Sequence, residues 1–169
     1  GPGVSRVLCS GPAGPATGAP FTAYAGAMQI RYERIVSRAA LHKARATYRG
    51  SGRVDEGKVL WTHKATTTSS TNSGPIDNTA STTGGGAGYF QLSAYASAAL
   101  STSVLARVQH SSDNITYADL ISFTAATAAP TAQRVETTAV VERYVRMAAS
   151  YGGGAAPATA VMFVGFARY

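Results

Sequence analysis

A histidine, two serines and an aspartate follow one another in this sequence, as His110-Ser111-Ser112-Asp113. These are the residue types of a nucleophilic triad, in which histidine removes the serine proton and the carboxylate orients the imidazole. A triad must converge on one substrate, however, and consecutive residues of a strand point to opposite faces. The sequence also has no Gly-x-Ser-x-Gly elbow between a strand and a helix. We therefore interpret His110 as the end of a strand and Asp113 as a turn residue that binds its own backbone.

The other residues that could hold a metal ion or a phosphate lack the required spacing. Cys9 is the single cysteine, and His42, His63 and His110 have no zinc-type pairing. Residues 84–88 are rich in glycine but lack the Lys-Ser/Thr of a phosphate-binding loop. We expect no catalytic residues, no cofactor and no metal.

The carboxylates of the second half are scattered along the chain. A glycosidase pair stays open from sequence alone, but we favour surface solvation or ion pairs with Arg134, Arg143 and Arg146. The acids concerned are Asp77, Asp113, Asp119, Glu136 and Glu142.

A series of cations with aromatic residues among them is the strongest functional signal. Lys and Arg recur every few residues between positions 31 and 64, together with Tyr32, Tyr48 and Trp61. Such a series can meet a partner subunit, form a solvated strand face, or bind nucleic acid through phosphate contacts and stacked bases. We rank these three interpretations in that order, and only the third predicts binding that falls steeply with salt. The predicted interface residues are Arg31, Arg34, Arg38, Lys43, Arg45, Arg49, Arg53 and Trp61.

The positive charge is confined to one part of the chain. The first 64 residues hold ten Lys/Arg and three Asp/Glu, whereas residues 65–169 hold five of each. Charged residues make up only 14% of the chain, against roughly 25% in an average domain. Ala, Thr, Ser and Gly take their place, and small neutral side chains pack easily against copies of the same protein. No apolar run is long enough to span a membrane, the first residues make a poor signal peptide, and the lone cysteine cannot form an internal disulfide.

Three segments are predicted to position these residues. Residues 1–27 are expected to be an irregular, extended Gly/Pro-rich arm that lies on a partner. In residues 28–64, the basic strand segment, Met28, Ile30 and Tyr32 alternate with polar residues as in a half-buried strand. Residues 35–48 fit either a helix or a strand, and we favour a strand. In residues 65–169, short alternating runs between turn residues predict an antiparallel, jelly-roll-like β-sandwich, so the fold class is mostly β.

Residues 52–169 also carry a set of motifs. They are GKVLWTHK at 57–64, DNTAS at 77–81, GGAGY at 85–89, VQHSSDNITYADL at 108–120, AQRV at 132–135, RYVR at 143–146 and FVGFAR at 163–168. As a set they resemble the later half of tailed-bacteriophage structural proteins, especially tail tube (major tail) proteins. The Ser-Ser-Asp-Asn-x-Thr-Tyr turn and the Arg-Tyr-Val-Arg strand are also similar to galactose-binding-like sandwiches of the discoidin type.

The resemblance implies a non-enzymatic virion component that is assembled in the host cytoplasm. Tube proteins of that family stack as hexameric rings around a channel that conducts DNA. Copies of the chain and other virion proteins are therefore the expected partners, with passing contact with genomic DNA and none with a membrane. A tail-associated protein or a capsid decoration protein is an alternative built on the same sandwich.

Two functions from other classes compete with a virion role. A carbohydrate-binding module would use exposed aromatic residues, with Trp61, Tyr89, Tyr95 and Tyr151 as candidates. A tail-borne hydrolase is the third hypothesis, and the sequence offers no assembled catalytic set for it. If the virion interpretation holds, a chain without residues 1–27 is expected to remain a folded, soluble sandwich that no longer assembles.

Overall fold

The computed structural model describes residues 6–10, 13–14, 16–35, 43–50, 52–66, 70–96, 102–154 and 159–169. Strands dominate these residues, and one 3-10 turn, Gly152–Gly154, follows the eleventh strand. The strands are β1 (Arg6–Ser10), β2 (Pro20–Ile35), β3 (Lys43–Gly50), β4 (Val54–Thr66), β5 (Ser70–Asn72), β6 (Ile76–Asp77), β7 (Gly86–Ala96), β8 (Val104–Ser111), β9 (Ala118–Ser122), β10 (Thr131–Thr137), β11 (Tyr144–Tyr151) and β12 (Thr159–Arg168).

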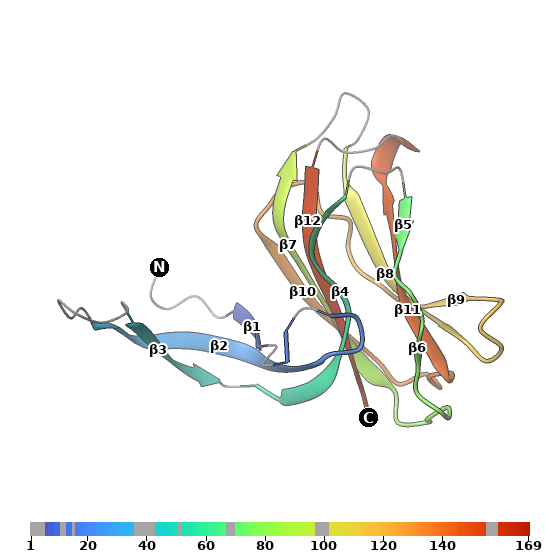
Figure 1. The fold of residues 1–169 in the computed structure, drawn as a ribbon, viewed down its shortest axis with the longest axis horizontal. Coiled ribbons are helices and arrows are strands. Elements are labelled where there is room, and N and C mark those ends of the chain that lie inside the picture. Colours follow the sequence, from blue (N-terminus) through green and yellow to red (C-terminus); the bar gives the residue numbers. More distant parts are fainter. Residues whose placement is uncertain are drawn as a thin grey trace.

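The strands form two antiparallel sheets that face each other (Figure 1). The first sheet has the order β1-β2-β4-β12-β7-β10, with β3 also paired to β2. The second has the order β5-β11-β8-β9, with β6 also paired to β11. The prediction of a mostly-β, antiparallel sandwich is confirmed.

The main core lies between the two sheets and follows from period-two alternation. In β8, Val104, Ala106 and Val108 are buried, while the residues between them are partly exposed. In β12, Met162 and Val164 face this core. Side chains on alternate positions of a strand share one face, so each alternating run supplies one row of the core.

A second apolar cluster lies on the other face of the first sheet. It contains Phe21 and Ala23 of β2, Val59 of β4, Ala87 and Tyr89 of β7, and Phe163 and Ala167 of β12. Strand β12 is thus buried on both faces, as its nearly continuous apolar sequence requires. The first sheet curls so that β1 comes close to β10, which helps to enclose this cluster.

Glycine allows the close packing of Phe21 in this second cluster. The ring lies edge-on to Tyr89, with a centroid distance of 5.6 Å, and edge-on to Phe163 at the same distance. A Cβ atom added to Gly165 would lie 2.6 Å from the Phe21 ring, and one added to Gly57 would lie 2.7 Å from it. Both distances are shorter than van der Waals contact, so the ring fits only because these two residues have no side chain.

A two-stranded ribbon leaves the body of the sandwich, as Figure 1 shows for β2 and β3. We call it the ribbon, and it comprises residues 27–35 of β2 and 43–50 of β3, paired from Ala27 with Gly50 to Ile35 with Lys43. The 16 residues of β2 correspond to a length of roughly 50 Å at about 3.3 Å per residue. The strand favoured for residues 35–48 is confirmed for Ile35 and for residues 43–48, and residues 36–42 lie outside the described part of the chain.

The expectation that residues 1–27 are irregular is wrong for residues 6–10 and 20–27, whereas residues 13–14 and 16–19 belong to no strand. Arg6–Ser10 forms β1, and β2 begins at Pro20 and pairs with both β1 and β4. Phe21 and Ala23 alternate with polar Thr22, and this period-two pattern buries them although the flanking sequence is rich in Gly and Pro. The expected strand at Val59 is also longer than predicted, because β4 runs from Val54 to Thr66 and pairs with β12 within the first sheet.

Candidate interaction site

Five of the eight predicted interface residues lie on the ribbon. Arg31 and Arg34 belong to β2, and Lys43, Arg45 and Arg49 belong to β3. In the register of the pair, Arg31 lies opposite Thr47, Arg45 opposite Glu33 and Lys43 opposite Ile35. The ribbon therefore carries five cations and a single acid in two short strand segments. Arg38 lies outside the described residues.

Arg53 and Trp61, the other two described members of the predicted set, lie apart from the ribbon. Arg53 precedes β4 at the point where the ribbon joins the body, and its guanidinium lies 3.7 Å from the centre of the Tyr169 ring. Trp61 is in β4, where it is partly buried and packs against the main core. The prediction thus grouped residues that the fold divides between the ribbon, its root and the body.

A cluster of polar side chains ties the root of the ribbon to the sandwich. We call it the anchor cluster, and it consists of Arg53, Asp55, Tyr89, Arg134 and Tyr169. The Asp55 carboxylate, which is 2% exposed, accepts hydrogen bonds from Tyr89 Oη, from Arg134 Nη2 at 2.8 Å and from Tyr169 Oη at 3.1 Å. Arg53 Nε lies 3.0 Å from the same carboxylate. Four parts of the chain, β4, β7, β10 and the residue after β12, therefore meet at one buried charge.

The electrostatics of the anchor cluster fix its protonation. Burial raises the pKa of Asp55, but the hydrogen bonds from Tyr89 and Arg134 and the charge of Arg134 outweigh burial, so the pKa lies below the ordinary value. Burial and the bond to Asp55 raise the pKa of Tyr89. Burial lowers the pKa of Arg134, but its hydrogen bonds with Asp55, Tyr89 and Glu136 outweigh burial and raise it. Aspartate and arginine are therefore charged and the tyrosine is neutral at neutral pH. Because Asp55 and Arg134 hold opposite charges in contact with each other, we interpret the cluster as an anchor.

The residues with triad chemistry make a turn. Asp113 Oδ1 accepts hydrogen bonds from Ser111 Oγ at 2.8 Å and from the N–H groups of Ile115 and Thr116 at 2.9 Å each. His110 Nδ1 accepts a bond from the backbone N–H of Glu142 at 3.2 Å. The serine hydroxyl thus faces aspartate and the histidine faces the backbone of Glu142, which precedes β11, so the set is not assembled for proton relay. The predicted turn role of Asp113 is confirmed.

Two exposed carboxylates are held in their charged form, and they give the protein a defined acid sensitivity. The hydrogen bonds from Arg143 lower the pKa of Asp77 to about 2, and the N–H groups of Ile115 and Thr116 lower that of Asp113 to about 2. Both values lie below the roughly 3.9 of an unfolded chain, so the unfolded state binds protons first as the pH falls.

We expect the free energy of unfolding to be insensitive to these two groups above about pH 5 and to fall from about pH 4 to pH 2. Urea unfolding at a series of pH values checks this. The double variant Asp77→Asn/Asp113→Asn should lose less stability across that window than the wild type. An equal loss in both proteins would contradict the assignment.

Sequence reasoning missed the anchor cluster. Asp55 and Arg134 are 79 positions apart, and Tyr169 is 114 positions from Asp55. One sequence signal was available, since Asp55 alternates with Val54 and Glu56 at the register of a buried strand face. The ion pairs foreseen for Arg134 and Arg143 do exist, as Arg134 contacts Glu136 at 2.5 Å and Arg143 contacts Asp77 at 2.7 Å.

The aromatic residues considered for a sugar site and the single cysteine are partly or wholly packed inside the protein. Of the four aromatic residues that a sugar site would need, Tyr89 and Tyr151 are buried and cannot stack on a sugar. Cys9 packs against the second apolar cluster, where burial raises the pKa of its thiol to about 12. Cys9 therefore acts as a small apolar residue at neutral pH.

Within the described ranges, no three His, Cys, Asp or Glu side chains come close enough together to hold a metal ion. The described residues also include no helix that is long and apolar enough to cross a membrane. Comparison of the chain with models of protein families, with curated proteins and with solved structures finds no match.

Proposed function

We propose that this protein is a non-enzymatic structural subunit of a bacteriophage virion, a tail tube or tail-associated protein that assembles through repeated contacts between copies. The observation that carries the proposal is the ribbon, a basic two-stranded extension rooted in a rigid sandwich. In the proposed mechanism the ribbon lies on a neighbouring subunit, and the sandwich supplies the repeating body.

The first support is the exposure of backbone along the ribbon. In the described residues, β3 pairs with β2 alone, and the part of β2 beyond Ala27 pairs with β3 alone. An isolated two-stranded ribbon is marginally stable in water at best, and open strand edges readily pair with another chain. A neighbouring subunit would satisfy both edges, which favours a docked ribbon over a free one.

The second support is the division of charge. The ribbon holds Arg31, Arg34, Lys43, Arg45 and Arg49 with Glu33 as its only acid. Residues 65–169 carry equal numbers of acidic and basic residues, so a subunit of this kind would not repel the ribbon of a neighbour. The anchor cluster at the ribbon root then fixes the direction in which the ribbon leaves the body, a requirement for a regular assembly.

The test is a matched pair of triple variants. In the ribbon variant, Arg31→Gln, Arg45→Gln and Arg49→Gln remove three positive charges, and in the control Lys64→Gln, Arg107→Gln and Arg143→Gln remove three from the body of the sandwich. Both proteins have the same net charge, so colloidal effects cancel. We expect the wild type and the control to form rings or tubes in electron micrographs, and the ribbon variant to lose them or to need at least tenfold more protein.

Three outcomes would overturn the proposal. A wild type that stays monomeric at all concentrations would contradict assembly. Equal assembly by the two triple variants would remove the ribbon from the interface. Tight binding of duplex DNA that is lost in the ribbon variant and falls steeply with added salt would assign the ribbon to nucleic acid instead.

A further inference from the structure

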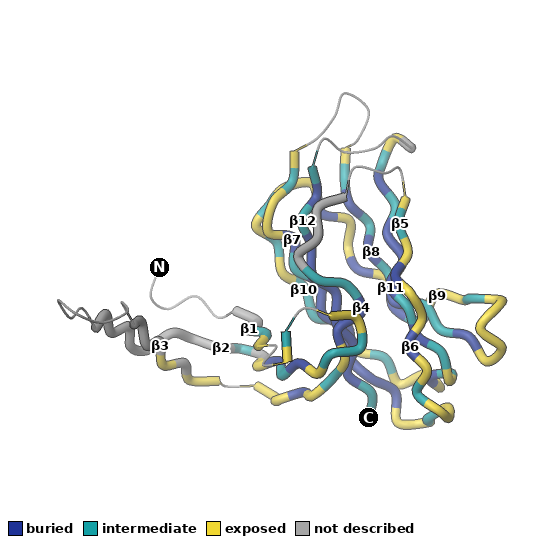
Figure 2. The backbone as a smooth tube through the Cα atoms, viewed as in Figure 1, coloured by how far each residue is buried: buried dark blue, intermediate teal, exposed yellow. Residues whose placement is uncertain are grey.

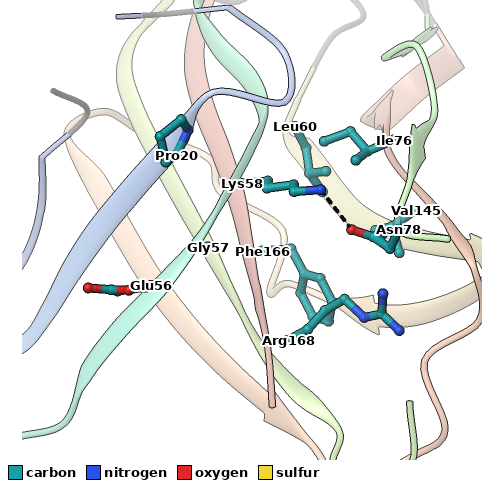
Figure 3. Close-up of a pocket in the computed structure, with 10 residues that line it drawn as sticks. All are labelled: Pro20, Glu56, Gly57, Lys58, Leu60, Ile76, Asn78, Val145, Phe166 and Arg168. Carbon is teal, nitrogen blue, oxygen red and sulfur yellow. Dashed lines mark hydrogen bonds between the residues drawn. The ribbon is translucent and has the colours of Figure 1, made fainter. Parts of the chain in front are cut away.

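A cleft opens between β4 and β12 of the first sheet and β6 and β11 of the second (Figure 3). We call it the edge cleft, and it has a volume of about 320 Å³. The buried side chains of Leu60, Ile76, Val145 and Phe166 form its apolar floor. Strands β4 and β12 supply one wall, and β6 and β11 supply the other. A volume of this size is at the lower end of the roughly 300–1,000 Å³ typical of ligand sites.

Two cations, Lys58 and Arg168, and one acid, Glu56, line the edge cleft, and the charge of Lys58 also acts on the nearby carboxylate of Asp77. Lys58 Nζ donates to the neutral Oδ1 of Asn78 at 3.2 Å, and Arg168 Nη2 donates to the carbonyl oxygen of Ala80 at 2.8 Å. Among the described residues, neither Lys58 nor Arg168 forms an ion pair. Arg168 Nε is buried and has no hydrogen-bond partner in the described part of the chain. An apolar floor beside two such cations fits an apolar group that carries a carboxylate.

This chain itself presents such a group in the loop between β8 and β9. Ile115 is 84% exposed, the highest value among the exposed large apolar side chains of the described residues. Figure 2 shows this loop as an exposed projection at the side opposite the ribbon. Asp113 lies two residues from Ile115, and its Oδ2 accepts none of the bonds that hold the turn.

The loop is also rigid enough to act as a preformed knob. The bonds to Asp113 Oδ1 close the turn, and Tyr117 Oη donates to Asn114 Oδ1 at 2.5 Å. The guanidinium of Arg146 lies 3.7 Å from the centre of the Tyr117 ring. A preorganised loop loses little conformational entropy when it docks. Little of the free energy gained by burying its exposed apolar tip is therefore offset by ordering the loop.

We infer that the edge cleft receives the β8–β9 loop of a second copy, with Ile115 against the apolar floor and Asp113 facing Lys58 and Arg168. The inference rests on the proposed assembly and names a contact within it. Knob and cleft are different surfaces of one chain, so the contact is heterologous. Repetition of a heterologous contact gives closed rings or open filaments according to the rotation between copies.

The test uses the ribbon variant, Arg31→Gln/Arg45→Gln/Arg49→Gln, as background so that the loop contact is measured alone. A knob variant adds Ile115→Asp, a cleft variant adds Lys58→Glu, and Ile115→Leu keeps an apolar knob as control. Sedimentation of the background should show concentration-dependent association. The knob variant should weaken it roughly tenfold to a hundredfold, as expected for the loss of one buried apolar side chain, whereas the control should not. At a protein concentration at which the background associates, the knob and cleft variants should each be largely monomeric, and their mixture should form a 1:1 dimer through the one intact contact.

The outcomes separate this inference from the proposed function. If the wild type assembles but the knob variant associates as strongly as the control, the loop contact is overturned and the ribbon contact stands. If the ribbon background does not associate at all, the loop contact is likewise overturned. Binding of octanoate in the edge cleft by a chain that shows no self-association would assign the cleft to a small apolar carboxylate instead. A monomeric wild type would overturn both proposals.

Discussion

Replacement of Asp55 by asparagine is expected to lower the free energy of unfolding by about 3–5 kcal/mol, the usual cost of removing one member of a buried ion pair. The Asp55 side chain is fully buried and that of Arg134 is 18% exposed. Asparagine has nearly the same shape, so packing is retained while the charge is lost. Arg134 then keeps its positive charge in a largely buried place, and the exposed Glu136 is the one acidic partner that remains to it among the described residues. The unpaired charge, more than the lost bonds, sets the size of the effect.

Urea unfolding at pH 7 measures this effect, and the chain supplies a matched control. Asp77 also pairs with an arginine, Arg143, at 2.7 Å, but both side chains are more than 40% exposed. Asp77→Asn should therefore cost far less unfolding free energy than Asp55→Asn. If Asp55→Asn and Asp77→Asn shift the unfolding midpoint equally, Asp55 is not the anchor that we describe.

A second variant identifies what destabilises the Asp55→Asn protein. If the unpaired charge of Arg134 is what destabilises Asp55→Asn, then removing that charge as well, in Asp55→Asn/Arg134→Leu, should recover part of the loss. If the double variant instead loses as much stability as its two single substitutions lose together, the lost hydrogen bonds alone account for the destabilisation.

The body of the sandwich could be predicted from the sequence because its strands are amphipathic. Val104, Ala106 and Val108 form a period-two row, and the row of apolar residues in β12 does the same. The turn at Asp113 was also accessible, because an Asx turn needs only residues within a few positions of the aspartate. Where alternating apolar residues and turn-forming side chains agree, a single sequence is enough to predict a strand or a turn.

The N-terminal part could not be predicted because its decisive contacts are distant in sequence. Phe21 stands in a Gly/Pro-rich neighbourhood, and its partners Tyr89 and Phe163 lie far along the chain. The anchor cluster has the same character, since Asp55 meets Arg134 and Tyr169 only after the first sheet has curled. The edge cleft depends on how strands of the two sheets face each other, a property of the topology that no local pattern reports.

Substitution of Phe21 by alanine is the second variant with a large expected effect, about 3–5 kcal/mol of unfolding free energy. Phe21 is 2% exposed and packs edge-on against two other rings. The space beside it cannot close easily, because Gly57 and Gly165 offer no side chain to fill it. Tyr24 on the same strand is 37% exposed, and Tyr24→Ala should stay within about 0.5 kcal/mol of the wild type. Equal thermal midpoints for the two variants would contradict a core role for Phe21.

A deletion of residues 1–27 would affect the stability of the fold as well as any assembly. It removes all of β1 and the part of β2 that carries Phe21 and Ala23, and so uncovers Val59, Tyr89 and Phe163. We expect the truncated chain to unfold at a lower temperature than Phe21→Ala and to bind a hydrophobic dye, because a cluster on the outer face of the first sheet is opened to water. A truncated chain as stable as the wild type would contradict this. Loss of assembly after such a deletion would follow from loss of the fold, so only charge-matched substitutions on an intact body can test the ribbon as an interface.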